Sequence, residues 1–274
     1  SLGIPAIELH KLYMDNADVI FGKKRNGIQR IVNSSYDRKN LETLLKEVFT
    51  KYNNEKEPRL ADCKTNVCVP IYDLLHGKPS VCKNNYHPKF TRDYHIPAHM
   101  VALATSAAPT YFNPYNASFV DLHSIKQSFS NKVDGGVVAN NPTLLGIVEA
   151  QAAFYQPLSN LKVLSIGTGY QKFTDGSNLQ KCGYKYWLQK GRMINLFMQG
   201  QSQQVENLIS LLQNGIDGEN RNNPAFIYKR INTELDETLD IEMDETDVKK
   251  LQKLSEKATF EFSNHASEIL ETYF

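Results

Sequence analysis

The 274 residues include 31 Lys and Arg against 30 Asp and Glu, which gives a formal net charge of +1. This near-balance argues against a nucleic-acid-binding protein, because such proteins usually gather a basic excess on one face. No apolar run approaches the roughly 18 residues that a membrane-spanning helix needs. A chain of this size can bury the core of a single large α/β domain.

The first part of the chain predicts two amphipathic helices. One begins at Pro5, a residue favoured at the first helical position, and continues to Phe21 with apolar residues three and four apart. Gly3, just before it, is typical of the C-terminal end of an earlier helix, so we expect the chain to open in mid-domain. The second helix follows Asp37.

The next segment has the pattern of a β-hairpin. Asn66–Tyr72 and Ser80–Cys82 are short and β-prone, and Leu75–Pro79 between them predicts a turn. Pro70 has no backbone N–H, which predicts an edge or a bulge instead of a fully paired central position.

Helices and strands then alternate to the end of the chain. The expected elements are a helix of small residues from Pro97 to Pro109, a strand around Val133, a helix with Asn141 as N-cap and Pro142 at its first position, a strand over Lys162–Ile166, one or two helices between Tyr186 and Leu212, a strand over Phe226–Ile231 and a helix from near Asp247. This alternation predicts an α/β layered fold with a mostly parallel sheet.

The most informative segment is Val133–Gly136, which is followed by Asn140-Asn141-Pro142. An Asp directly after an apolar strand places a carboxylate at the strand end, where ligand sites of open α/β sheets lie. The two glycines permit positive φ and close approach of other groups. By itself, however, the motif favours a turn that Asp134 merely braces, as Asp-Gly commonly does.

Three segments, taken together and in this order, resemble the patatin-like phospholipases. They are Ala104–Phe112, Asp134–Gly136 with Asn140–Pro142, and Leu164–Gly169. The resemblance covers residues 1–170 well and the remaining helices more loosely. It implies a three-layer α/β/α fold around a mostly parallel central sheet, in a single domain over residues 1–274 that lacks its N-terminal strands.

The resemblance also implies a catalytic base. The family uses a Ser–Asp dyad, and Asp134 matches the Asp of its D-G-[GA] motif, with Gly135 and Gly136 completing the motif. The family's serine lies in a G-x-S-x-G turn, preceded by a glycine-rich loop that supplies oxyanion-hole amides. Neither motif occurs in this sequence, so we expect the nucleophile outside the chain. Ser1 is disfavoured, because in the family a whole helix separates the nucleophile from the segment resembling Pro5–Phe21.

The expected reaction sets a requirement on Asp134. An exposed Asp is a weak base at neutral pH, whereas burial raises its pKa, so we expect Asp134 to be mostly buried at the floor of a cleft. The activated serine would attack an ester carbonyl, and water would then release the fatty acid from the acyl-enzyme. The implied protein is a cytoplasmic phospholipase A-like enzyme that acts peripherally on membrane glycerophospholipids and needs no cofactor.

Some bacterial members of the family are activated by cyclic nucleotides, so such an activator joins the expected partners, whereas a nucleic-acid polymer does not. The 274-residue chain alone is expected to be inactive. A degenerate relative that acts as a non-catalytic binding or regulatory module is the alternative. A third hypothesis, a serine esterase with a histidine, would depend on His265, the one histidine after Asp134.

Several other features favour structural roles. Gly167-Thr168-Gly169 predicts a tight turn, because Lys172 occupies the third glycine position of a dinucleotide motif. Ser106 lacks flanking glycines and is expected to pack. Cys63, Cys68, Cys82 and Cys182 lack the spacing of a metal site and are expected to be reduced thiols. The apolar segment Trp187–Met198 is interpreted first as core, with an acyl channel or a membrane interface as the alternative.

Overall fold

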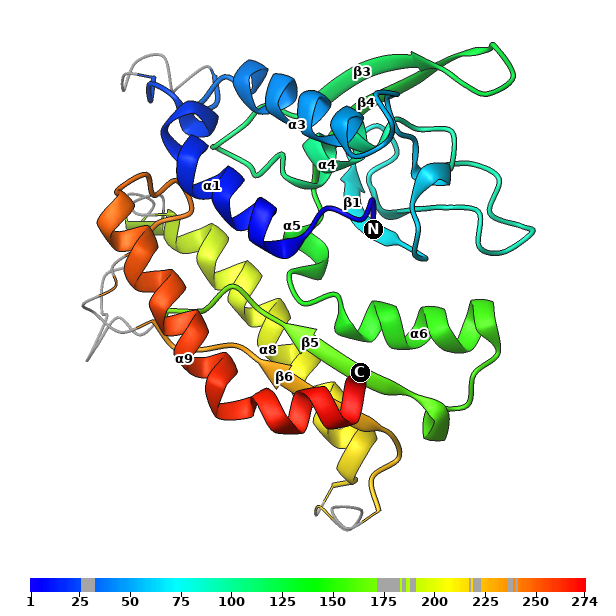
Figure 1. Cartoon of the computed structure of the whole chain (residues 1–274), viewed down its shortest axis with the longest axis vertical. Coiled ribbons are helices and arrows are strands. Elements are labelled where there is room, and N and C mark those ends of the chain that lie inside the picture. Colours follow the sequence, from blue (N-terminus) through cyan, green and yellow to red (C-terminus); the bar gives the residue numbers. More distant parts are fainter. Residues whose placement is uncertain are drawn as a thin grey trace. The chain divides into compact units, whose positions relative to one another are not determined.

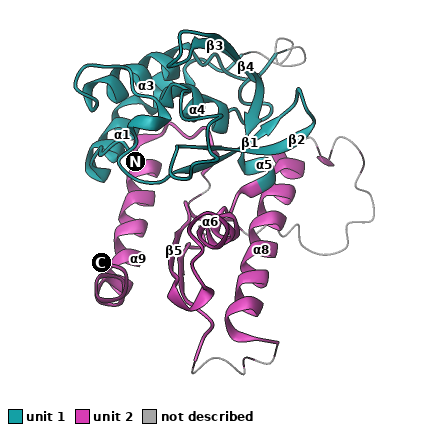
Figure 2. Ribbon diagram, turned by 90° about the vertical axis from the view of Figure 1, so that its right-hand side faces the viewer, with its two compact units in different colours: residues 1–138 teal, residues 139–274 magenta. Residues whose placement is uncertain are grey.

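The computed structural model describes residues 1–25, 33–171, 183, 186–187, 191–216, 218, 223–235, 239 and 241–274. These residues divide into two compact units, Ser1–Val138 and Ala139–Phe274, which Figure 2 colours separately. Each unit has an apolar core of its own. No described helix combines the length and the apolar character that crossing a bilayer requires.

The first unit combines helices with an antiparallel sheet (Figure 1). Its helical elements are α1 (Ala6–Phe21), α3 (Lys39–Lys51), the short η1 (Leu60–Asp62) and α4 (Ala98–Thr105). Its strands are β1 (Cys68–Asp73), β2 (Lys78–Lys83), β3 (Tyr115–Val120) and β4 (Lys126–Asp134), and they pair in the order β2-β1-β4-β3. The helix of small residues predicted between Pro97 and Pro109 is therefore confirmed as α4.

The core of this unit lies between α4 and the sheet. Helix α4 contacts β1, β3 and β4 on one side and α3 on the other. Ala104 and Ala107 are almost completely buried, and their small side chains let the helix and the residues after it lie close to the strands. The larger core side chains are Leu60, Ile71, Ile96, Val101, Leu103, Tyr115 and Phe129.

The α/β class is confirmed, but the prediction of a mostly parallel sheet is wrong for the four described strands of the first unit. All three of their pairings are antiparallel. For β1–β2 and β3–β4 the reason is the length of the connections, because residues 74–77 join β1 to β2 and residues 121–125 join β3 to β4. Segments this short can form only hairpins, since a parallel crossover needs about a dozen residues or more.

The second unit contains the parallel pair. Strands β5 (Lys162–Ile166) and β6 (Ile227–Ile231) pair in parallel register, with Ser165 opposite Arg230. Its helical elements are α6 (Thr143–Phe154), η2 (Leu158–Asn160), α8 (Arg192–Asn214) and α9 (Val248–Tyr273). The short helix α5 (Gly136–Ala139) spans the boundary between the two units. The core side chains are Ile147, Leu161, Val205, Ile209 and Phe226.

Local capping signals place two of these helices. Asp247 caps α9 as its side chain accepts hydrogen bonds from the backbone N–H groups of Lys249 and Lys250. Helix α6 begins at Thr143, one residue later than Pro142 predicts, and the Asn141 side chain accepts the Thr143 N–H at 3.2 Å. The helix predicted from near Asp247 is thus confirmed, and the predicted start of α6 at Asn141 and Pro142 is shifted by one residue.

Candidate active site

Asp134 is the last residue of β4, at the strand end where the sequence predicts it. Its cross-strand partner is Ile71 of β1, whose side chain is buried in the core. Its backbone N–H donates to the carbonyl oxygen of Ala107 at 3.2 Å, just after α4. The backbone of Asp134 is therefore fixed from two sides, by β1 and by the segment that follows α4.

The next residue, Gly135, turns the chain against β1. A Cβ atom at this position would lie 2.0 Å from the carbonyl oxygen of Pro70, so only glycine fits. Pro70 pairs with Val81 of β2 but lies just beyond the β1–β4 register, as the sequence predicts for a proline. The Pro70 carbonyl also accepts a hydrogen bond from the Thr105 hydroxyl at 2.7 Å.

The carboxylate of Asp134 is partly buried. Burial raises its pKa to about 6, and the hydrogen bond that the Gly136 N–H donates to its Oδ1 at 2.6 Å opposes part of this rise. At neutral pH the group is ionised, yet it is a much stronger base than an exposed aspartate. These are the properties that a general base near pH 7 requires.

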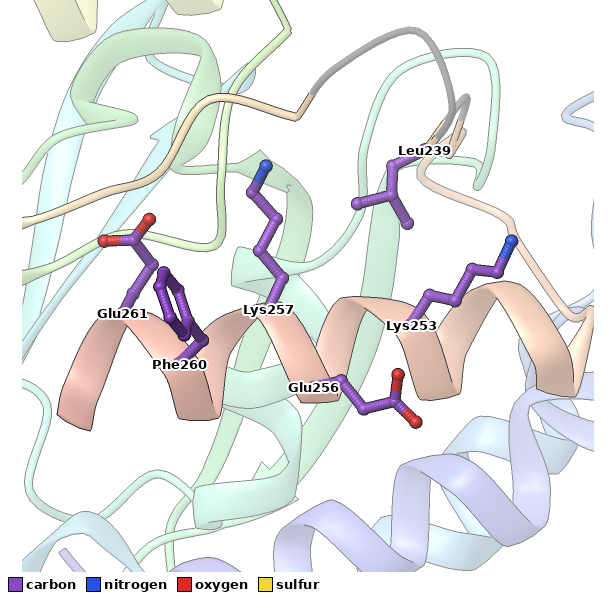
Figure 3. Close-up of a pocket in the computed structure, with 6 residues that line it drawn as sticks. All are labelled: Leu239, Lys253, Glu256, Lys257, Phe260 and Glu261. Atoms are coloured by element: carbon purple, nitrogen blue, oxygen red, sulfur yellow. The ribbon is translucent and has the colours of Figure 1, made fainter. Parts of the chain in front are cut away.

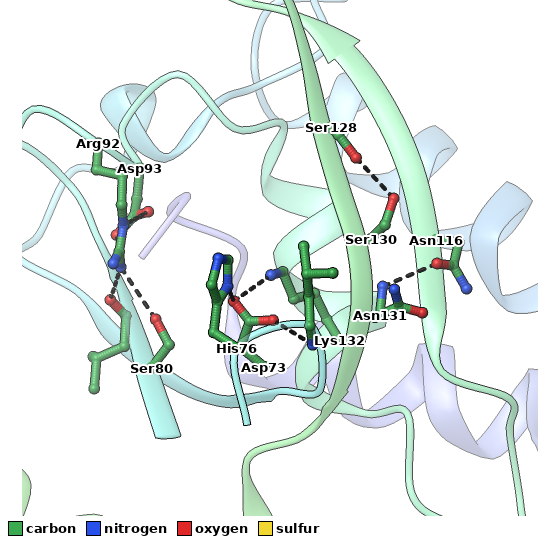
Figure 4. A network of polar contacts seen from close by, with 12 residues as sticks. Asp73, His76, Ser80, Arg92, Asp93, Asn116, Ser128, Ser130, Asn131 and Lys132 are labelled. Carbon is green, nitrogen blue, oxygen red and sulfur yellow. Dashed lines mark hydrogen bonds and ion pairs between the residues drawn. The ribbon is translucent and has the colours of Figure 1, made fainter. Parts of the chain in front are cut away.

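A second buried carboxylate lies close by in the same sheet. Asp73 of β1 is directly opposite Lys132 of β4, and the Lys132 ammonium lies 2.7 Å from Asp73 Oδ2. His76 Nδ1 lies 2.9 Å from the same oxygen (Figure 4). This cluster was not predicted, because no local pattern in the sequence connects Asp73 with Lys132.

The alternative nucleophiles and base make contacts of their own in the part of the chain that the structure describes. The Ser1 carbonyl accepts the Lys64 N–H at 2.8 Å. The Ser106 hydroxyl donates to the carbonyl of Ala102 at 2.8 Å, which fits the predicted packing role at the end of α4. His265 lies on α9 beside Glu268.

The Asn140-Asn141-Pro142 motif leads into a buried polar network of the second unit. Thr143 Oγ1 donates to Asn141 Oδ1 at 2.6 Å and lies 2.6 Å from the hydroxyl of Ser165 in β5. Ser165 in turn accepts a hydrogen bond from the guanidinium of Arg230 in β6, also at 2.6 Å. The start of α6 is thereby attached to both strands of the parallel pair.

The prediction of a tight turn at Gly167-Thr168-Gly169 is wrong, because after β5 the chain continues beside the segment that follows β6. The Gly167 N–H donates to the Ile231 carbonyl at 2.8 Å, and Tyr170 forms a parallel bridge with Glu234. A Cβ on Gly167 would lie 2.2 Å from Asn232 Oδ1, and the Gly169 N–H donates to that same oxygen at 3.0 Å. The glycines therefore let the two segments pack closely. Lys172 lies outside the described residues.

Three of the four cysteines lie in the described part of the chain. Cys63, Cys68 and Cys82 form no disulfide there, and burial raises the pKa of Cys82 far above its usual value. Cys182 lies outside the described residues. Among those that are described, no group of three or more His, Cys, Asp or Glu side chains could hold a metal ion.

The interpretation of the Trp187–Met198 segment as core is wrong for three of its residues. Met193, Leu196 and Phe197 are exposed on the first turns of α8, and Phe197 is 64% exposed. The part of α8 that enters the core is its later half, through Val205 and Ile209. Leu188 lies outside the described residues.

Figure 3 shows an open depression of about 470 Å³ along α9. Its lining is Leu239, Lys253, Glu256, Lys257, Phe260 and Glu261. The positive charges of its two lysines equal the negative charges of its two glutamates in number, and Glu261 accepts a hydrogen bond from the Thr233 hydroxyl at 2.8 Å. The depression contains no nucleophile or base with the properties of Asp134.

Comparison with known proteins gives the family. No protein-family model matches the chain. Over 136 residues the chain is 38% identical to a cGAMP-activated phospholipase of Vibrio cholerae, covering 47% of this chain and 36% of the relative. Over 210 residues it is 30% identical to a cGAMP-activated phospholipase of Pseudomonas aeruginosa, covering 75% and 58%. Over 243 residues it is 28% identical to Patatin-like protein 2 of Oryza sativa subsp. indica, covering 78% and 57%. The chain spans about half the length of these relatives, and it belongs to the patatin-like phospholipase family.

Proposed function

We propose that the protein cleaves fatty-acyl esters of membrane glycerophospholipids, with Asp134 as the general base of a Ser–Asp dyad. The observation that carries the proposal is the Asp134 carboxylate itself, fixed at a strand end on a glycine turn, with its pKa raised by burial to about 6. The names of the relatives, which are phospholipases and patatin-like proteins, support the lipid substrate.

The proposed reaction follows from what such a carboxylate does. Asp134 accepts the proton of the serine hydroxyl as the serine oxygen attacks the ester carbonyl, and it returns that proton to the leaving alcohol. It then deprotonates a water molecule that attacks the acyl-enzyme, and the fatty acid leaves. Backbone amides would stabilise the negatively charged oxygen of each tetrahedral intermediate.

The serine and the oxyanion-hole amides are proposed to come from polypeptide outside these 274 residues. The support is that no G-x-S-x-G segment occurs in the sequence. On this proposal residues 1–274 belong to one patatin-like domain, and they have no esterase activity by themselves.

The proposal extends to location and control. Relatives named as cGAMP-activated phospholipases support a cyclic-nucleotide activator for this protein. The protein is proposed to be cytoplasmic and to act peripherally at the membrane surface. The exposed side chains of Met193, Leu196 and Phe197 support the contact with the membrane, because apolar side chains of this kind suit the lipid interface.

A lipid-release assay on the intact protein that contains this chain tests the function. Phosphatidylethanolamine and phosphatidylglycerol vesicles are incubated with it, with and without cGAMP, and fatty acids and lysophospholipids are measured by mass spectrometry. We expect both products from the wild type and from Asp247→Asn, a matched change of an exposed aspartate, and about 10²–10⁴-fold less of both from Asp134→Asn. Absence of both products with and without cGAMP would favour the non-catalytic binding module.

A fluorophosphonate probe tests the origin of the serine. The probe forms a covalent bond with an activated serine hydroxyl, and the labelled peptide is identified by mass spectrometry. We expect the label on a glycine-flanked serine outside residues 1–274. A label on Ser1 or Ser106 would show that the nucleophile lies within this chain.

A further inference from the structure

Lys132 and Asp134 project from the same face of β4. Successive side chains of a strand alternate between its two faces, and the register is regular over the three pairs from Ile71↔Asp134 to Asp73↔Lys132. Directly opposed residues of an antiparallel pair share a face, so Asp73 belongs to this face too. One lysine therefore lies between two carboxylates, one across the sheet and one along its own strand.

The structure shows which carboxylate holds the lysine. The Lys132 ammonium lies 2.7 Å from Asp73 Oδ2, with the two side chains only 11% and 10% exposed. Asp73 also accepts the Leu75 N–H at 3.0 Å and contacts His76 (Figure 4). Burial alone would raise the pKa of Asp73, but the hydrogen bonds from Lys132 and His76 outweigh it and lower that pKa to about 2. Asp73 is thus ionised at every pH at which Asp134 titrates.

The alternative pairing is within reach. Residues two apart on a strand have Cα atoms about 7 Å from each other, a gap that the flexible four-carbon stem of a lysine can bridge. An ammonium that paired with Asp134 would lower the pKa of that carboxyl by about 1–3 units and weaken it as a base. In the structure the influences on Asp134 are burial and the Gly136 amide.

The other titratable groups around the ion pair are already occupied or neutral. His76 comes from the β1–β2 turn and contacts Asp73. Arg92, after β2, pairs with its neighbour Asp93 at 2.6 Å. The thiol of Cys82 on β2 is buried, which keeps it protonated. The Lys132 ammonium also lies 5.6 Å from the centre of the Phe129 ring, and Asp73 is the anion that holds it among the described residues.

We propose that Asp73 is a positioning residue for the hydrolysis reaction, which holds the Lys132 ammonium across the β1–β4 pair and so keeps that charge away from the Asp134 carboxylate. This inference rests on the proposed function only in taking Asp134 as the base.

Direct titration of Asp134 tests the electrostatic part without any reliance on activity. Aspartate labelled with ¹³C at the carboxyl carbon is followed by NMR in the intact protein, and the Asp134 signal is assigned as the one that Asp134→Asn removes. We expect Asp73→Asn to lower the pKa of Asp134 by about one unit or more. In the double variant Asp73→Asn with Lys132→Met, that pKa returns to the wild-type value.

The double variant Asp73→Asn with Lys132→Met keeps the test decisive if Asp73→Asn does not fold. Because the Asp73–Lys132 pair carries no net charge, replacing both residues is expected to change the pKa of Asp134 by less than about half a unit. A rise of about one unit or more in this double variant would show that the Lys132 charge acts on Asp134 in the wild type, and would overturn the proposal. An unchanged Asp134 pKa in folded Asp73→Asn would overturn it as well.

The pH–rate profile provides the second readout. In Asp73→Asn the acidic limb is expected to move to lower pH together with the Asp134 pKa, and kcat on the plateau to fall about tenfold while KM is kept. A purely structural role would lower activity at all pH values without moving that limb, and would contradict the proposal. If Asp134→Asn retained full hydrolysis, the proposed function would fail while the NMR titration still decided the electrostatic claim.

Discussion

Replacing Asp134 by asparagine is expected to stabilise the protein while it removes activity. The pKa of this carboxyl rises from an ordinary 3.8 to about 6 on folding. Each unit corresponds to about 1.36 kcal/mol, so the charged form costs the folded state about 3 kcal/mol. Because the folded pKa is the higher one, this cost is absent below the unfolded value, grows between 3.8 and about 6, and is complete above about 6.

Asparagine mimics the protonated carboxyl in size and charge. Its oxygen can still accept the Gly136 N–H that Asp134 Oδ1 accepts at 2.6 Å. Because the side chain is partly exposed, water reduces the cost, and we expect the free energy of unfolding to increase by about 1–3 kcal/mol at about pH 8. The gain should approach zero at about pH 4, where the wild-type carboxyl is protonated in the folded state.

Urea unfolding of the wild type and Asp134→Asn at about pH 4, 6 and 8 measures this difference. Asp247→Asn is the matched control, because Asp247 is an exposed helix cap and asparagine caps equally well. The control should show no gain that grows with pH. A lower stability of Asp134→Asn than of the wild type at about pH 8, or an equal gain at all three pH values, would refute the claim that burial destabilises the ionised Asp134 carboxylate.

Three further changes test the structure around the site, each by urea unfolding. Gly135→Ala should lower the free energy of unfolding by about 3 kcal/mol or more, because the new Cβ would overlap the Pro70 carbonyl. The control Gly146→Ala, in open space on α6, should raise the free energy of unfolding by about 0.5–1 kcal/mol. Equal effects of the two changes would contradict the close approach at Gly135. Asp247→Ala should cost about 1 kcal/mol as the α9 cap is lost, and no loss would show that the cap is dispensable. Ser165→Ala should cost about 1–3 kcal/mol, because it leaves the buried partners of that hydroxyl unsatisfied, and a neutral result would contradict the network.

Much of the secondary structure follows from local signals. Strand β5 has the predicted bounds, Lys162–Ile166, because an apolar β-prone run ends there at Gly167. Helix α9 starts next to Asp247, close to where the sequence predicts it. The sheet direction was predicted wrongly for the first unit, although the predicted turn between β1 and β2 already indicated one hairpin, and strand β3 (Tyr115–Val120) was not predicted.

For the site, too, the local features were predicted and the features that depend on tertiary packing were missed. The turn at Asp134 and Gly135 is encoded in consecutive residues, and the sequence places it at the end of a strand as observed. The Asp73–Lys132 pair depends on the register between β1 and β4, which tertiary packing decides. The exposure of Phe197 was also missed, because helical spacing shows which residues share a face but not what covers that face.

The pH dependence of fatty-acid release by the intact protein, wild type against Asp134→Asn, examines the role of Asp134 most directly. The wild-type rate should rise with pH as one group with a pKa of about 6 loses its proton, and then reach a plateau. Asp134→Asn should lower the plateau by about 10²–10⁴-fold and remove that transition. An Asp134→Asn protein that kept both the rate and the acidic limb of the wild type would contradict the assignment of Asp134 as the base.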